Sequence, residues 1–252
     1  MMDLNQELVE QFNQNGYLLL ENRFAPEKVS EIRKEIESIS SLDGPEFFRE
    51  EAGAIRTIFS PENYSDKLKK LVKSEELVGP LRRLFNEPFY LFQSKYNNKK
   101  SLQSGSWPWH QDFTFWQEDG MPAAKAITAA IYLTDITDFS GPILCVPGTH
   151  KHGRIDTELN NPDGVHDENL KYLITPETLE KMTTLYGKVL STAGNAGSVL
   201  YFHSDILHGS FQNMYYIDRM IMMFTYNPLS NKTVPVENPR EEFMVKRDFS
   251  TI

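Results

Sequence analysis

Hydrophobic residues recur at helical spacing through the first third of the chain. Two apolar stripes have this spacing, one formed by Leu4, Leu8, Val9 and Phe12 and the other by Val29, Ile32, Ile36 and Ile39. Gly16 follows the first stripe and predicts a helix end, while Pro26 stands where the second helix is expected to begin. Core packing explains both stripes, and we assign them no catalytic role.

Two further patterns complete the first part of the chain. Residues 17–21, "YLLLE", predict a short strand. Residues 65–85 predict one or two helices, interrupted around Gly79 and Pro80. We therefore expect residues 1–87 to be mainly helical.

The hydrophobic period changes at residue 88. Short runs rich in β-branched and aromatic residues, separated by Gly, Pro, Asn or Asp, occupy residues 89–98, 126–136, 142–150, 197–202 and 219–227. Helices followed by many short strands predict an α+β fold with a jelly-roll or cupin-like double-stranded β-helix core and flanking helices. We expect one domain over residues 1–252, with a jelly-roll core over 88–252 and a polar excursion near 151–187 that covers the site.

Composition restricts the cellular compartments and the binding partners expected for this chain. The net charge of −9 argues against nucleic acid or an anionic membrane surface as a partner. Cys145 is the only cysteine, so no intramolecular disulfide is possible, which fits a reducing compartment. The N-terminal residues lack the pattern of a secretory signal, and no run of about 18 apolar residues occurs. We expect a cytoplasmic protein that is a monomer or a homodimer.

The stretch "WHQDFTFW", residues 109–116, contains the first candidate for metal chemistry. If the strand pattern continues, His110 and Asp112 point to the same face and both reach one metal. Two histidines and one carboxylate suit a non-haem Fe(II) and leave coordination positions open. An isolated His-x-Asp is common by chance, so the prediction depends on a second histidine elsewhere. His208 is our preferred ligand, and His203, five residues earlier, is the alternative.

Arg219 strengthens this prediction. It lies 11 residues after His208 and opens an apolar strand, where burial of an unpaired guanidinium would be costly. A guanidinium holds a carboxylate well through two parallel hydrogen bonds. An iron ligand followed by an inward arginine is what binding of a dicarboxylate oxo acid beside the metal requires.

The pattern His110-x-Asp112, His208 and Arg219 resembles the phytanoyl-CoA dioxygenase superfamily of Fe(II)/2-oxoglutarate-dependent oxygenases. Its small-molecule branch, with ectoine hydroxylase and the free proline hydroxylases, is the most similar part. The resemblance is carried by the motifs at 93–97, 109–122, 141–151, 207–213 and 238–250.

This resemblance implies a role for each matching residue. His110, Asp112 and His208 would hold iron as the catalytic centre. Cosubstrate 2-oxoglutarate would be bound by Arg219 and Ser210 at its distal carboxylate, and by Gln93 and Asn97 near the metal. Substrate would be bound by Arg240 and Trp116, although Arg240 could equally be a surface arginine and Trp116 equally a core residue.

The resemblance also implies an oxidative reaction. With O2, the enzyme would hydroxylate an sp3 carbon and release succinate and CO2. Asp112 fills the position that related halogenases leave open for chloride, so hydroxylation is favoured. The run "FTFWQEDGMP" lacks a glutamate and one further residue that ectoine hydroxylase has, which argues against ectoine and leaves a small amino acid such as proline or a pipecolate-like compound.

Several alternatives remain open. Ectoine or a natural-product intermediate could be the substrate, and a non-redox cupin-like metal protein is the alternative to an oxygenase. Lys95 is either an electrostatic contact for the cosubstrate or a solvated strand residue. His150, His152 and His166 are expected in solvated loops, and Cys145 is expected to be a small buried hydrophobe.

Overall fold

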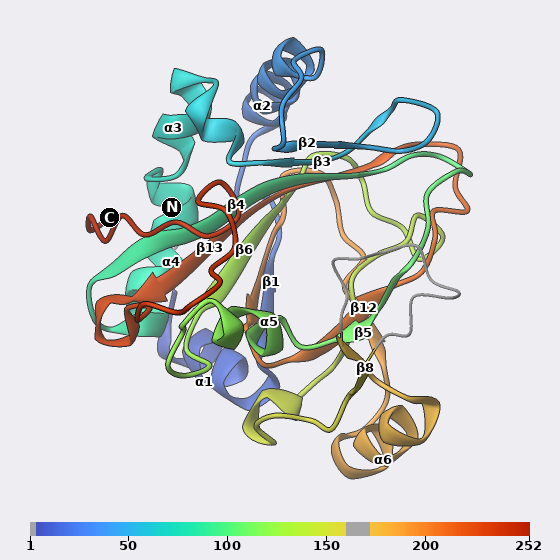
Figure 1. The fold of residues 1–252 in the computed structure, drawn as a ribbon. Helices are drawn as coiled ribbons and strands as arrows, with labels where there is room; N and C mark the ends of the chain where they lie inside the picture. The colour runs from blue at the N-terminus through green and yellow to red at the C-terminus, as the bar shows by residue number, and fades with distance from the viewer. Residues whose placement is uncertain (1–3, 160–171) are drawn as a thin grey trace.

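Two antiparallel sheets that face each other form the centre of the protein (Figure 1). The computed structural model describes residues 4–159 and 172–252. The large sheet has the strand order β1-β11-β6-β13-β4-β3-β2, and the small sheet has the order β10-β7-β12-β5. The large sheet contains β1 (Tyr17–Leu20), β2 (Phe47–Arg49), β3 (Ile55–Phe59), β4 (Phe89–Lys99), β6 (Ile127–Tyr132), β11 (Val199–His203) and β13 (Arg219–Pro228). The small sheet contains β5 (Trp107–His110), β7 (Leu144–Val146), β10 (Leu190–Ser191) and β12 (Leu207–Ser210). The arrangement is the jelly-roll core that the strand pattern predicts.

Residues alternate between the two faces of the large sheet. The inner face packs on the small sheet through apolar side chains that include Tyr132, Phe202 and Ile221 of the large sheet and Cys145 of the small sheet. Cys145 is therefore the small buried hydrophobe that its sequence context predicts. The outer face, with its own apolar set of Ile131, Tyr201, Met222 and Phe224, packs on the helices. Burial on both faces explains why these strands are continuous hydrophobic runs.

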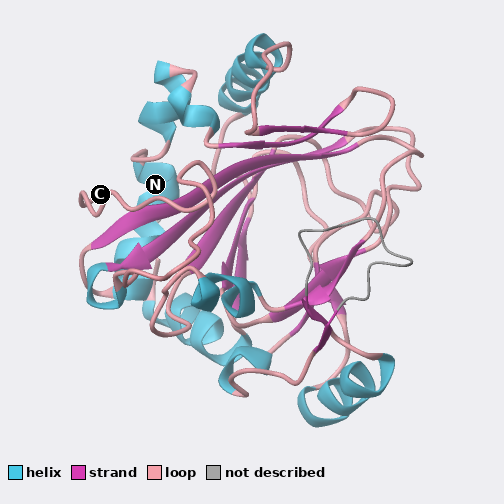
Figure 2. Cartoon of the chain, viewed as in Figure 1, coloured by secondary structure: helices cyan, strands magenta, loops and turns pink. Residues whose placement is uncertain are grey.

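The N-terminal helices cover the outer face of the large sheet (Figures 1 and 2). They are α1 (Gln6–Asn15), α2 (Pro26–Ile39), α3 (Asp66–Leu71) and α4 (Glu75–Phe85). The Asn5 side chain accepts a hydrogen bond from the Leu8 amide, and Gly16 ends α1 with a φ of 78°. The predicted stripes on α1 and α2 are confirmed as core-facing.

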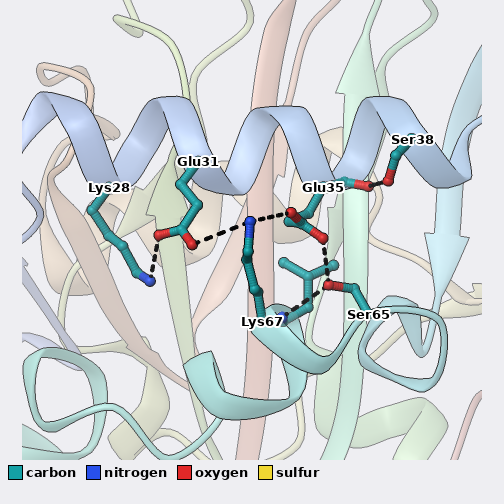
Figure 3. A network of polar contacts seen from close by, with 7 residues as sticks. Lys28, Glu31, Glu35, Ser38, Ser65 and Lys67 are labelled. Carbon is teal, nitrogen blue, oxygen red and sulfur yellow. Dashed lines mark hydrogen bonds and ion pairs between the residues drawn. The ribbon is translucent and has the colours of Figure 1, made fainter.

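A surface network connects α2 to α3 (Figure 3). The Lys67 ammonium lies 2.8 Å from a Glu35 carboxylate oxygen and 3.6 Å from Glu31. The Ser65 hydroxyl, on the residue that caps α3, donates to Glu35 at 2.8 Å. Solvent screens exposed ion pairs of this kind, so the network contributes little to the stability of the fold.

The predicted interruption at Gly79 and Pro80 is wrong. The break between α3 and α4 lies at residues 72–74, and Pro80 is inside the continuous helix α4. A proline removes the hydrogen bond to the carbonyl four residues earlier, which is that of Glu76. Arg23 donates to this carbonyl at 3.0 and 3.3 Å, and the Tyr201 hydroxyl lies 3.4 Å away. These tertiary donors satisfy the carbonyl, and the helix passes through the proline.

Several short strands do not follow from the sequence pattern. The hairpin β2–β3 extends the large sheet within the part expected to be mainly helical. Strands β5 and β12 lie outside the runs predicted as strands, although His110 is expected on a strand face. These segments have three to five residues each, too few for a clear alternation of side chains.

The polar excursion leaves the sheets near the small sheet. Its described part includes the two-stranded ribbon β8 (Glu158–Leu159) and β9 (Tyr172–Leu173), and α6 (Pro176–Tyr186). His166 lies outside the described residues. The remaining helical elements are α5 (Asp112–Glu118), η1 (Pro61–Asn63), η2 (Thr149–Lys151) and η3 (Leu229–Asn231). Across the described ranges, the helices are too short or too polar for any of them to cross a bilayer.

Candidate metal centre

Three side chains, carried by strands β5 and β12 of the small sheet and by helix α5, lie close together. His110 ends β5, and His208 is its direct cross-strand partner on β12. Their ring centroids are 4.2 Å apart. The Asp112 carboxylate oxygens lie 3.6 Å from His110 Nε2 and 3.9 Å from His208 Nε2. One ligand atom from each residue lies within 4.8 Å of the others, so a single metal ion can be held by all three.

The strand geometry predicted for His110 and Asp112 is partly wrong. Asp112 is not on a strand with His110, because β5 ends at His110 and Asp112 is the first residue of α5. Gln111 fixes this turn from a strand into a helix. Its amide nitrogen donates to the carbonyls of Asp205 and Gly153, and its amide oxygen accepts from the Ile155 amide. The carboxylate therefore reaches the metal site from a helix start that is anchored on three sides.

Both histidines present Nε2 to the site. His110 Nδ1 lies 2.7 Å from the Pro108 carbonyl oxygen, and His208 Nδ1 lies 3.1 Å from that of Ile206. A carbonyl can only accept, so Nδ1 carries the proton and Nε2 keeps its lone pair for a metal. This tautomer is the one that a first-row divalent ion requires.

The electrostatics of the site agree with this protonation. Burial alone would raise the pKa of Asp112, but the neighbouring side chains of His110 and His208 and the charge of Lys95 outweigh it and hold the pKa well below its usual range. Burial, followed by the proximity of His110, lowers the pKa of His208 to about 4. An ionised Asp112 carboxylate and a neutral His208 imidazole are thus the stable forms near pH 7.

His203 is not part of this cluster, which agrees with our preference for His208. It ends β11, and its Nδ1 accepts a hydrogen bond from the Asp205 amide. Its ring lies 5.2 Å from that of His150, whose Nε2 is 3.1 Å from the Asn13 carbonyl oxygen. His150 is therefore packed against α1 and only partly exposed, in contrast to the solvated loop position that we predicted.

Arg219 begins β13 and is almost completely buried, with 1% of its surface exposed. Its Nε and Nη1 have no hydrogen-bond partner among the described residues. Burial lowers the pKa of Arg219 to about 10, against the opposing influence of Tyr132 and Tyr96. Ser210, the predicted helper, is also buried and ends the strand that carries His208. A buried guanidinium with hydrogen-bond donors that are not used is suited to bind a carboxylate.

Gln93 and Asn97 lie on one face of β4, as predicted. Asn97 is the cross-strand partner of Ile221, an inner-face residue, so both amides project between the two sheets. Gln93 Nε2 donates to the Met244 carbonyl at 2.7 Å, and Asn97 Oδ1 accepts from the Thr57 hydroxyl at 3.0 Å. These contacts hold both amides on the side of the sheet that carries Arg219.

The two predicted substrate residues have strong protein contacts of their own. Trp116 on α5 is buried and packs edge-to-face on Phe92, with ring centroids 5.3 Å apart. Arg240 binds the buried Asp119 carboxylate through Nε at 3.0 Å and Nη2 at 2.5 Å. Trp116 lies within α5 and Asp119 directly follows this helix, which begins with Asp112.

Two lysines of β4 contribute more than the sequence indicated. Lys95 is the cross-strand partner of the inner-face residue Met223, and its charge helps to hold the pKa of Asp112 down. Lys95 is half-buried and acts electrostatically on the centre, while its contact with the cosubstrate stays a prediction. Lys99 is 2% exposed and pairs across the strands with Arg219, a position that sequence reasoning did not consider. The sequence signal for both lysines is the alternation of polar residues along β4, namely Gln93, Lys95, Asn97 and Lys99, which predicts that all four lie on one face of the strand.

Comparison with known proteins agrees with this centre. The family model described as phytanoyl-CoA dioxygenase matches residues 12–220. L-proline trans-4-hydroxylase from Streptomyces griseoviridis is 33% identical, and the match covers 96% of this chain and 92% of that protein. Ectoine dioxygenase from Bordetella bronchiseptica is 31% identical, with 97% and 83% covered.

A solved structure shows the same fold with ligands bound. EctD from S. alaskensis, crystallised with 2-oxoglutarate and 5-hydroxyectoine, superposes with a TM-score of 0.82 at 25% identity. The match covers 96% of this chain and 84% of that chain. A crystal structure of the same protein with bound Fe superposes equally well.

Proposed function

The chain belongs to the phytanoyl-CoA dioxygenase family, and we propose that it hydroxylates an sp3 carbon of a small free amino acid of the proline or pipecolate type. It is an Fe(II)- and 2-oxoglutarate-dependent dioxygenase, with O2 as the second cosubstrate. The observation that carries the proposal is the convergence of His110, Asp112 and His208, together with the buried Arg219, whose Nε and Nη1 have no hydrogen-bond partner in the described part of the chain.

The residues present fit an Fe(II) ion. Two neutral imidazoles and one carboxylate are a preferred ligand set for this ion, and they leave coordination positions for a chelating cosubstrate and for dioxygen. When bound, iron with 2-oxoglutarate and dioxygen supplies the oxidising power to hydroxylate an unactivated carbon. Asp112 occupies the position of the carboxylate ligand, which favours hydroxylation over halogenation.

The chain's own side chains would orient the cosubstrate. We assign the distal carboxylate of 2-oxoglutarate to Arg219, with the Ser210 hydroxyl as a second donor. Gln93 and Asn97 are assigned to the cosubstrate near the metal, because both amides project from the inner face of β4. A cosubstrate held at its far end has a fixed position relative to the metal. A fixed position lowers the entropic cost of the reaction.

For the substrate, we assign its carboxylate to Arg240 and part of its contact surface to the region of Trp116. The Asp119 pair uses Nε and Nη2 of Arg240, so Nη1 is not part of that ion pair. Asp119 would then hold the guanidinium in place while Nη1 binds the substrate. The acidic net charge of −9 also suits a zwitterion better than a phosphate-rich acyl-CoA.

The relative that supports this substrate class is the L-proline hydroxylase, which matches over nearly its full length. The ectoine dioxygenases support a second candidate, ectoine, at similar identity. A panel of free amino acids and ectoine separates the two candidates.

The test begins without oxygen. Fe(II) and then 2-oxoglutarate are added to the purified protein, and we expect a weak visible charge-transfer band from the chelate. Air is then admitted with L-proline, L-pipecolate, other free amino acids or ectoine, and succinate is measured against hydroxylated product. Succinate coupled to one amino acid supports the proposal, and coupling to ectoine alone overturns the substrate class.

Asp112→Ala is the matched variant. It removes the carboxylate ligand while both histidines remain, so we expect neither the band nor coupled succinate. Normal turnover by this variant would overturn the assignment of the ligands.

A further inference from the structure

Lys99 is a buried lysine beside the arginine of the cosubstrate site. It ends β4, it is 2% exposed, and it is the direct cross-strand partner of Arg219. Directly opposed residues of an antiparallel pair place their side chains on the same face of the sheet. The ammonium or amine of Lys99 is thus a neighbour of the guanidinium that we assign to the distal carboxylate.

The polar partners of Lys99 are two neutral carbonyls. Its Nζ donates to the Ser210 carbonyl at 3.3 Å and to that of Phe211 at a shorter distance. Both carbonyls belong to the end of β12 and the residue after it, directly next to the Ser210 hydroxyl. Gly141 lies against the same lysine, because a Cβ at this glycine would be 3.2 Å from Lys99 Cδ. The side chain is therefore enclosed on several sides by backbone.

Positively charged side chains surround Lys99. Arg219 faces it from β13 and Arg56 from β3, and both disfavour a charged lysine. The Glu50 carboxylate lies 3.9 Å from Arg56 Nε and pairs with that arginine. Asp218 is next to Arg219 in sequence, but its carboxylate is engaged by the Lys100 ammonium at 3.1 Å and the Ser101 amide at 2.8 Å. Within the described ranges, neither Lys99 nor Arg219 has an ion pair with an acidic residue.

The remaining groups around this pair do not supply a charge. Tyr132 on β6 and Tyr96 on β4 act on Arg219, and burial raises the pKa of each tyrosine well above its usual range, so both stay neutral. Burial, and then the charges of Arg219 and Arg56, lowers the pKa of Lys99 to about 6. A neutral amine has two N–H donors, and two carbonyls accept from Lys99. An ammonium would have a third donor, and no acidic residue in the described ranges forms an ion pair with it.

We propose that Lys99 is a neutral amine when no cosubstrate is bound and takes up one proton when 2-oxoglutarate binds, so that the distal carboxylate is held by two cations, Arg219 and Lys99. This inference rests on the proposed role of Arg219. The proton comes from solvent and the incoming carboxylate stabilises the ammonium, while no covalent bond in the cosubstrate changes. Lys99 is thereby a binding residue that couples cosubstrate affinity to pH.

The coupling has a defined direction. Above the pKa of the free lysine, binding must take up a proton, so affinity falls as pH rises. Below it, Lys99 is already protonated and binding takes up none. Arg219 stays charged throughout this range and cannot produce such a dependence.

Titration calorimetry tests the proposal on the full-length protein loaded with Mn(II), without oxygen. The heat of 2-oxoglutarate binding is measured at one pH in buffers of different ionisation enthalpy, and the slope gives the number of protons taken up. We expect close to one proton at pH 8 and close to none at pH 5 for the unaltered protein. This pH series needs no variant, so a folding defect cannot hide the answer.

Two variants then show which side chain takes up the proton. Lys99→Met should take up no proton at pH 8 and should bind 2-oxoglutarate about 10- to 100-fold more weakly at pH 6, since it loses one charge-assisted hydrogen bond. Lys100→Met is the matched control, because Lys100 is the next residue but pairs on the surface with Asp218. It should keep the proton uptake of the unaltered protein.

The outcomes separate this inference from the proposed function. Binding at pH 8 without proton uptake overturns the role of Lys99 and leaves the cosubstrate site standing. Proton uptake that persists in Lys99→Met assigns the proton to another group and also overturns it. Absence of any binding heat at every pH overturns both proposals together.

Discussion

Replacing Arg219 with methionine should make the protein more stable and at the same time unable to respond to its cosubstrate. Arg219 is 1% exposed, and its Nε and Nη1 have no partner among the described residues. Each buried unsatisfied donor costs about 1–3 kcal/mol. Methionine keeps most of the apolar stem and removes both donors together with the charge, so most of this cost should be recovered.

The magnitude follows from these numbers. Two donors give about 2–6 kcal/mol, and lost contacts of the guanidinium reduce the expected gain in the free energy of unfolding to about 2–4 kcal/mol. For a chain of this size, 1 kcal/mol corresponds to about 2–4 °C in Tm, so Tm should rise by about 5–15 °C. In the unaltered protein, 2-oxoglutarate at about 100 times its Kd should add about 2.7 kcal/mol, and in Arg219→Met it should add nothing.

Thermal unfolding with and without 2-oxoglutarate, in the presence of Mn(II), measures both effects. Arg82→Met is the matched control, since Arg82 pairs with Glu75 at 2.6 Å on the exposed side of α4. Its Tm and its response to the ligand should stay within about 0.5 kcal/mol of the unaltered protein. A lower Tm for ligand-free Arg219→Met would show that the guanidinium is satisfied in the folded protein. An undiminished response to 2-oxoglutarate would show that another group holds the cosubstrate.

Three further predictions concern stability and are checked by urea unfolding. Burial raises the pKa of Asp205 from 3.8 to about 6, so the folded state binds the proton more tightly than the unfolded state and stability falls as pH rises from about 4 to 6. Asp205→Asn should therefore gain about 2–3 kcal/mol at pH 7.5 and almost nothing at pH 3.5, and an equal gain at both values would contradict a titration of Asp205 as the cause. Gly197 has a φ of 87°, and a Cβ there would lie 2.2 Å from the Phe24 carbonyl oxygen, so Gly197→Ala should cost about 2–4 kcal/mol. A cost below about 0.5 kcal/mol would mean that this turn can move away. Tyr201→Phe should cost about 1–2 kcal/mol, because the buried Leu77 carbonyl loses a hydrogen bond of 3.0 Å, and an unchanged midpoint would mean that another donor replaces it.

Pro80 shows where local sequence rules stop. A proline inside a helical pattern normally predicts a break, because one carbonyl loses its donor. In this protein the donors are Arg23 and Tyr201, which are 53 and 125 residues from Glu76 in sequence. No local pattern contains that information, so the break was placed at the wrong residue.

Asp112 lies close to His110 and His208, as the predicted ligand set requires, but the local structure expected for it is wrong. The spacing of His110 and Asp112 fits two residues on one strand face, and it equally fits a strand end followed by a helix start. Which of the two occurs depends on Gln111, whose side chain is anchored on the backbone of residues 153, 155 and 205. Local spacing restricted the metal ligands to a few candidates, while these distant contacts set the path by which the carboxylate arrives.

The sequence by itself determined the features that depend on period and on chemical type. The helical stripes on α1 and α2, the long buried strands, the histidines and carboxylate that suit iron, and an arginine too costly to bury without an anion are all readable along the chain. Each of these signals lies within one element or in the chemistry of a single side chain.

Only the tertiary structure decided which of these groups meet. Antiparallel pairing puts His208 opposite His110 and Lys99 opposite Arg219, residues that are about 100 positions apart in sequence. The tertiary structure also brings Arg240 to Asp119. It leaves Arg219 without a carboxylate partner among the described residues. Register between distant strands results from the packing of both faces of a sheet at once, so no single segment specifies which charges become neighbours or which remain unpaired.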